Sequence, residues 1–160
     1  MELCERVRQV LDGWGRFKHG PRSLWVEADD LEVSAEVLAA DELSCSLEKL
    51  QVARHGDAAW GEAELKARAE RVAKRVTYLL EHVGPIELDR ERGIALLRSV
   101  PPDKRDAQTL YYELHLSAAG RLALVRYRVT SGEPGRVQVP CNLTRETLEK
   151  LVRDLAEVAA

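Results

Sequence analysis

The fold of this chain depends most on residues 110–129, which read LYYELHLSAAGRLALVRYRV. Both halves alternate apolar with polar residues, the period of two that is typical of half-buried strands. Burying apolar area is worth about 25 cal/mol per Å², so the pairing should gather the apolar residues on one face. We therefore predict a hairpin whose loop, at residues 118–121, has an even number of residues. In this register the buried face pairs Leu110, Tyr112, Leu114 and Leu116 with Val129, Tyr127, Val125 and Ala123.

The polar face of this hairpin is the sharpest candidate site. A carboxylate beside an imidazole can orient and charge it, and two guanidinium groups can hold an anionic ligand. The predicted register brings together Tyr111, Glu113, His115, Arg126 and Arg128. The alternative is a set of cross-strand ion pairs that solubilise the sheet, which we favour because no nucleophile, metal ligand set or glycine loop lies nearby in sequence. No catalytic residue is assigned.

Residues 23–54 also have the pattern of strands. Apolar residues alternate with Ser and Glu from Leu31 to Val37 and from Leu43 to Leu47, with a turn at residues 39–42. A partial helical period competes with this interpretation. Another hairpin is predicted around the loop at residues 89–93, followed by a charged surface loop at residues 101–106 and a last short strand at residues 137–139.

Three helices are predicted. The first places apolar residues at helical spacing from Leu3 to Trp14, and the second spans about residues 61–82 up to the Gly84-Pro85 stop. The third begins near Thr144, a good N-cap. Its predicted buried face consists of Leu148, Leu151, Val152, Leu155 and Val158.

These elements predict a single α+β domain over residues 1–160, with a twisted, mostly antiparallel sheet packed by about three helices in the order α-β-β-β-α-β-β-β-β-β-α. A chain of 160 residues is long enough to bury its own core. The order of elements resembles the layout of type III secretion chaperone-like domains. No motif accompanies this resemblance, so it implies no site residues.

Composition excludes several partners and compartments. The net charge is −3 and the 24 basic residues are spread along the chain, so nucleic acid is not an expected partner. No window approaches the roughly 18 apolar residues of a membrane span, and no signal peptide is recognisable. The three cysteines are odd in number and far apart, and none belongs to a Cys-x-x-Cys pair, which favours free thiols in a reducing compartment; we therefore expect a cytoplasmic protein without membrane contact.

Neither a cofactor nor a metal is expected. The histidines at positions 19, 55, 82 and 115 are at least 27 residues apart and form no ligand motif, and no phosphate-binding glycine loop occurs. Cys141 precedes the last helix, where a thiol can be activated with a base such as His115. A buried apolar role is the better interpretation of all three cysteines.

The expected function is therefore binding rather than catalysis. Trp14, Trp25 and Trp60 lie near element ends, where they either cap the core or contribute to an interface. Strand edges also need cover. We expect a non-enzymatic adaptor or chaperone-like domain that binds another polypeptide or itself as a homodimer; the alternative is a small-molecule site or enzyme on the face of Tyr111, Glu113 and His115.

Overall fold

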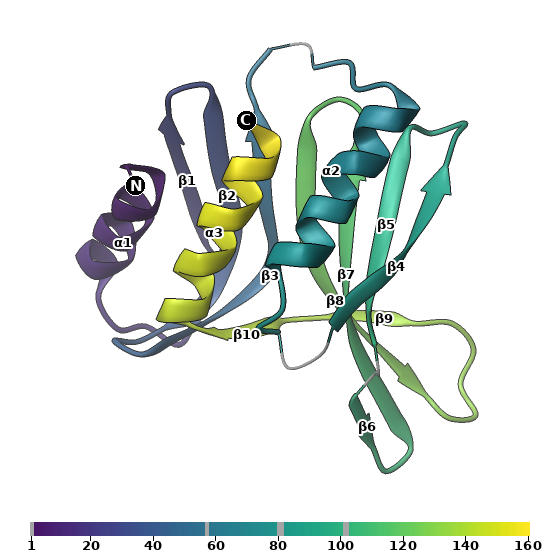
Figure 1. Cartoon of the computed structure of the whole chain (residues 1–160). Helices are drawn as coiled ribbons and strands as arrows, with labels where there is room; N and C mark the ends of the chain where they lie inside the picture. Colours follow the sequence, from purple (N-terminus) through teal and green to yellow (C-terminus); the bar gives the residue numbers. More distant parts are fainter. Residues whose placement is uncertain (1, 57, 80–81, 101–102) are drawn as a thin grey trace.

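The computed structural model describes residues 2–56, 58–79, 82–100 and 103–160. Three helices lie on one side of an antiparallel sheet (Figure 1): α1 (Glu2–Trp14), α2 (Glu62–Arg75) and α3 (Arg145–Ala159). The strands are β1 (Arg22–Ala28), β2 (Leu31–Ala40), β3 (Ser44–Arg54), β4 (His82–Asp89), β5 (Ile94–Val100), β6 (Asp103–Arg105), β7 (Gln108–Ser117), β8 (Arg121–Thr130), β9 (Val137–Val139) and β10 (Cys141–Thr144). The predicted α+β class is confirmed.

The main path of the sheet runs β1-β2-β3-β8-β7-β5-β4. Beside it, β10 pairs with β3, β6 with β7 and β9 with β8. The ends of β7 and β8 that carry β6 and β9 extend beyond the helices (Figure 1). Among the described strands, β1 and β4 are therefore the two edges of the main path.

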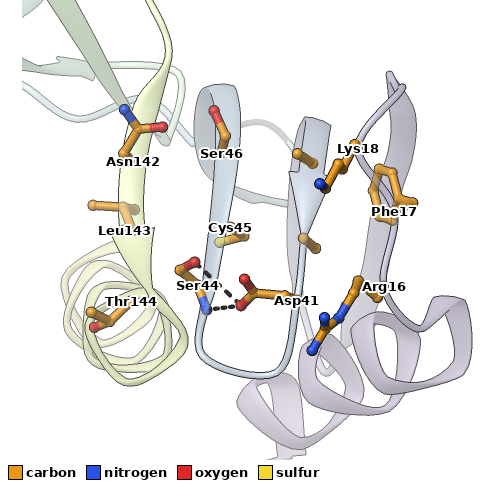
Figure 2. A pocket seen from close by; sticks show the side chains of 12 residues that line it. Arg16, Phe17, Lys18, Asp41, Ser44, Cys45, Ser46, Asn142, Leu143 and Thr144 are labelled. Atoms are coloured by element: carbon orange, nitrogen blue, oxygen red, sulfur yellow. Dashed lines mark hydrogen bonds between the residues drawn. The ribbon is translucent and has the colours of Figure 1, made fainter.

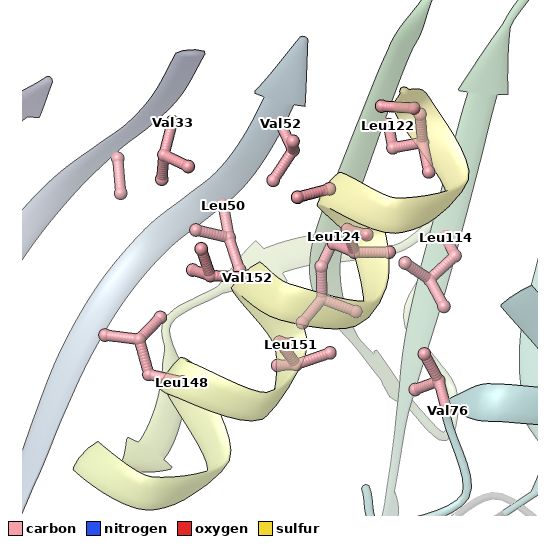
Figure 3. Close-up of a cluster of buried hydrophobic side chains, with 14 of the residues drawn as sticks. Val33, Leu50, Val52, Val76, Leu114, Leu122, Leu124, Leu148, Leu151 and Val152 are labelled. Atoms are coloured by element: carbon pink, nitrogen blue, oxygen red, sulfur yellow. The ribbon is translucent and has the colours of Figure 1, made fainter. Parts of the chain in front are cut away.

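One sheet face, called here the helix-covered face, holds the core. α3 lies across its middle, and Leu148, Leu151 and Val152 point into the sheet (Figure 3). They meet Leu50 and Leu124, which are also fully buried. All five predicted buried residues of α3 are confirmed, and the Thr144 hydroxyl accepts the Thr147 backbone N–H as the predicted N-cap.

None of the helices in the described residues lies on the opposite face, called here the open face. Its centre is nevertheless shielded, because Ala53, Ala123, Val125 and Glu113 are each less than 7% exposed. Val125 and Ala123 face this side together with Glu113 and His115, their partners in the hairpin. The open face is thus a partly apolar surface with one buried carboxylate.

The predicted register of the β7–β8 hairpin is wrong. Ser117 pairs with Arg121 around a three-residue loop, so Leu114 lies opposite Leu124 and Glu113 opposite Val125. Gly120 has a φ of +89°, the left-handed conformation that completes such a three-residue loop. The geometry of the turn therefore determines the register. In this register Ala123 and Val125 lie on the open face, whereas Leu122 and Leu124 are part of the core.

Other boundaries also differ from the prediction. α2 ends at Arg75, so Val76 and Leu79 are buried beyond the helix instead of inside it. The predicted charged loop contains the short strand β6, while Pro101 and Pro102 lie outside the described residues. Leu43, predicted to be part of a strand, is 80% exposed in the β2–β3 turn. The three strands within residues 22–54 and the β4–β5 hairpin, with Gly93 at φ +63°, are confirmed.

Candidate functional site

The predicted cluster on β7 forms around Glu113, whose side chain is 1% exposed on the open face. His115 Nε2 lies 2.5 Å from Oε1, and Arg98 Nε donates to Oε2 at 3.1 Å. Arg136 Nη1 donates to the same Oε2 at 2.7 Å. Burial alone would raise the pKa of Glu113, but the hydrogen bonds from His115, Arg136 and Arg98 outweigh it and lower this pKa to about 2.

Arg136 links this cluster to the loop before β9. Its guanidinium also donates to the Tyr111 hydroxyl at 3.0 Å and stacks on the Tyr127 ring at 3.7 Å. These contacts raise the Arg136 pKa, with the Glu113 hydrogen bond as the largest cause. Because both carboxylate oxygens are occupied by the chain's own donors, the cluster is satisfied internally and functions as a structural ion network.

Arg126 and Arg128 do not join this cluster. Alternation along β8 places them on the helix-covered side, opposite Tyr112 and Leu110. Arg126 stacks on Tyr112 at 4.2 Å and has Asp103 at 4.0 Å. Within the described residues, its Nη1 and the Nε of Arg128 are buried without a hydrogen-bond partner. The five residues predicted as one ligand-binding face are thus divided between two faces.

The three tryptophans have different environments. Trp60 is 6% exposed beneath the guanidinium of Arg68, and Trp14 packs edge-to-face on Phe17. Trp25 is 58% exposed on β1. Its indole Nε1 donates to Glu32 at 3.4 Å, while the rest of the ring remains available. Of the predicted interface residues, Trp25 is the one that presents a large apolar surface to solvent.

A groove runs beside Trp25, between α1 and the free edge of β1. It has a volume of about 440 Å³. Its lining comes from Arg6, Gln9 and Val10 on the helix and Trp25, Val26 and Glu27 on the strand. The groove beside this edge strand is therefore lined by apolar side chains and by charged groups of both signs, Arg6 and Glu27.

A larger hollow of about 610 Å³ lies where β3 meets β10 (Figure 2). Arg16, Phe17 and Lys18 form one wall, and residues 142–144 form the other. The Asp41 carboxylate at its floor accepts the backbone N–H groups of Leu43 and Ser44, so it caps the β2–β3 turn. The carboxylate of Asp41 is thus engaged by the β2–β3 turn beside this hollow.

The three cysteines are buried, and none of them forms a disulfide bond within the part of the chain that the structure describes. Burial raises the pKa of Cys45, which lines the large hollow, to about 11, and that of Cys141 to about 12. Both thiols are therefore protonated at neutral pH. Cys141 is fully buried at the start of β10, which matches the predicted apolar role.

Sequence reasoning missed Arg98 and Arg136, which come from β5 and from the loop before β9. Arg98 lies directly opposite Glu113 on the neighbouring strand, a pairing that the sequence pattern does not reveal because β5 and β7 are not joined by a tight turn. The groove at β1 was missed because it depends on where α1 packs. None of the helices in the described ranges is long and apolar enough to span a membrane.

Comparisons with known proteins leave the family open. No protein-family model matches the chain, and neither a curated protein nor a solved structure matches it. The resemblance of its layout to type III secretion chaperone-like domains therefore stays a prediction.

Proposed function

We propose that this domain binds an extended segment of another polypeptide, which adds as a strand to the free edge of β1. The observation that carries the proposal is Trp25, an indole 58% exposed on an edge strand that pairs on one side with β2. Exposed aromatic residues beside unpaired strand edges supply the two components of strand addition, an apolar anchor and a row of backbone groups.

The hydrogen bonds of the sheet determine which backbone groups are free. Arg54 N–H donates to Gly120 on the β8 side, so the alternation along β3 directs Ala53 toward β2. Carried across β2, the same alternation directs Ala28, Val26 and Leu24 toward β2. The N–H and C=O groups of Ser23, Trp25 and Glu27 therefore point outward to the free edge.

The position of α1 favours a lone strand over a second copy of the domain. α1 packs on β1 at this end of the sheet (Figure 1). Two copies that paired β1 with β1, about 4.8 Å apart, would bring their α1 helices close together over the joined strands. Packed helices need about 8–10 Å. A lone strand has no second α1 to accommodate, so we favour it over a β1–β1 homodimer.

The surroundings of the edge define the chemistry of the partner. On the open face, Glu27, Glu32 and Glu36 lie around Trp25 on two adjacent strands. A basic side chain on the added strand would lie across from Glu27, where opposite charges stabilise cross-strand pairs. In the groove between α1 and β1, Val10 and Val26 provide an apolar lining. The preferred partner is thus an extended segment that alternates basic and apolar residues.

The test is selection of peptides from a displayed library, with counter-selection against a variant whose edge is blocked. Ser23→Pro removes one outward N–H without removing a bond to β2. Ser23→Ala is the matched control, because it removes the same hydroxyl, which donates to Glu36 at 2.7 Å, and keeps the N–H.

We expect peptides with basic and apolar residues in alternation that bind the wild type and Ser23→Ala at least about tenfold more tightly than Ser23→Pro. Trp25→Ser should weaken them similarly, whereas Leu43→Ser, which changes an exposed leucine in the β2–β3 turn, should not. Selected peptides that bind all variants equally, or a selection that yields no binder, would refute the proposal.

A further inference from the structure

Two glutamates face each other directly at the end of the β1–β2 hairpin. Glu27 pairs with Glu32 on the open face. They form a pair without mutual backbone hydrogen bonds, the type in which opposite side chains approach most closely. Like charges in this arrangement are destabilising. Among the described residues, neither carboxylate forms an ion pair with a lysine or an arginine, so this repulsion has no permanent counter-charge.

The imidazole of His55 lies beside both carboxylates and forms a three-residue cluster with them. Its Nε2 lies 3.2 Å from Glu27 Oε1 and 3.2 Å from Glu32 Oε2, and the three ligand atoms all lie within 4.8 Å of one another. Around a tetrahedral Zn²⁺ with bonds of 2.0–2.1 Å, neighbouring ligand atoms are about 3.3–3.4 Å apart. The two distances from His55 are close to this spacing, and the two carboxylate oxygens, which lie within 4.8 Å of each other, need only approach to complete it.

The backbone holds these side chains in place. The His55 N–H donates to the Asp30 carbonyl at 2.7 Å, which ties the end of β3 to the β1–β2 turn. The Trp25 indole donates to Glu32 Oε2, the type of outer hydrogen bond that orients a ligating carboxylate. Ligands from two strands and a following segment are thus positioned by the sheet itself.

We propose that Glu27, Glu32 and His55 bind a divalent transition-metal ion, with Zn²⁺ as the ion that suits them best. One imidazole and two carboxylates are ligands that Zn²⁺ accepts. The side chains are 43%, 28% and 37% exposed, which leaves room for water at the fourth position. The metal site does not require the proposed peptide binding, but Glu27 belongs to both sites, so metal binding is tested in the absence of peptide.

The test is calorimetric titration of the full chain with Zn²⁺ at pH 7.5. Co²⁺ reports the geometry through the visible absorption of its tetrahedral complexes. His55→Gln and Glu32→Gln remove one ligand each while conserving size. The matched controls are His19→Gln and Glu36→Gln, which change an exposed histidine and a glutamate of the same strand outside the cluster.

We expect one Zn²⁺ per chain, with affinity reduced at least about tenfold in each ligand variant and unchanged in both controls. Excess Zn²⁺ should also raise the melting temperature of the wild type and of both controls, but not that of the two ligand variants. Absence of binding, or binding that His55→Gln and Glu32→Gln retain in full, would overturn the proposal and leave His55 as a simple ion-pair partner of the two glutamates.

Discussion

Leu114 on β7 lies directly opposite Leu124 on β8, on the helix-covered face, because the loop between the two strands has three residues. Gly120 makes this loop possible with its φ of +89°. A Cβ at this position would lie 2.9 Å from the Ala58 Cβ. Gly120→Ala is therefore expected to lower the free energy of unfolding by about 1–3 kcal/mol, measured by urea denaturation.

Gly13→Ala provides the matched control for Gly120→Ala. Gly13 lies in α1, and a Cβ there would meet no atom within 4 Å. Alanine favours helix, so this substitution should leave stability unchanged or raise it by up to about 1 kcal/mol. Equal stability of the two variants would show that the loop does not require its glycine.

Glu113 should make the domain sensitive to acid. Its pKa is about 2 in the folded chain and near 4.3 when unfolded, so its contribution is present above pH 4.3 and is lost as the pH falls toward 2. Glu113→Gln is expected to cost about 2–3 kcal/mol at pH 7 and to flatten the loss of stability between pH 5 and 2. Urea unfolding at a series of pH values measures both effects.

Glu87→Gln is the control for this prediction. Glu87 also faces Arg98, at 3.6 Å, but its side chain is 60% exposed. An exposed pair contributes little, so the change should be below about 1 kcal/mol at every pH. If Glu87→Gln flattened the pH profile as much as Glu113→Gln, the buried network would not be the source of the acid sensitivity.

Leu151 tests the assigned core, because its side chain is fully buried against the sheet. Leu151→Ala should lower the free energy of unfolding by about 2–5 kcal/mol through lost burial and the cavity left behind. Leu43→Ala removes the same atoms from a side chain that is 80% exposed and should change it by less than about 0.5 kcal/mol. Thermal or urea unfolding of the two variants compares them directly; similar losses would contradict the assigned core.

Local patterns in the sequence predict much of this fold. The alternation from Leu31 to Val37 and the 3.6-residue period of α3 each reflect burial of one face, which acts on neighbours along the chain. The register of β7–β8 could not be obtained in this way. Burial favoured an even loop, but the backbone geometry around Gly120 set an odd one, and the displaced Val125 became buried on the open face instead.

The candidate sites were less accessible to sequence reasoning. Tyr111, Glu113 and His115 alternate on one strand, so their shared face was predictable. Arg98 reaches Glu113 from a strand that is adjacent only in space, and His55 meets Glu27 and Glu32 only because the end of β3 returns to the β1–β2 turn. Histidine spacing along the chain therefore suggested no metal site, since spacing motifs detect ligands that share one local element.

The outward amides of β1 test the central claim most directly. Amide hydrogen exchange of Ser23, Trp25 and Glu27 can be measured with and without a selected peptide. The account predicts that these three amides exchange rapidly in the free domain and become protected on binding, and that Ser23→Pro abolishes protection of the other two. Binding that leaves them unprotected, or that protects the β4 edge instead, would contradict strand addition at β1.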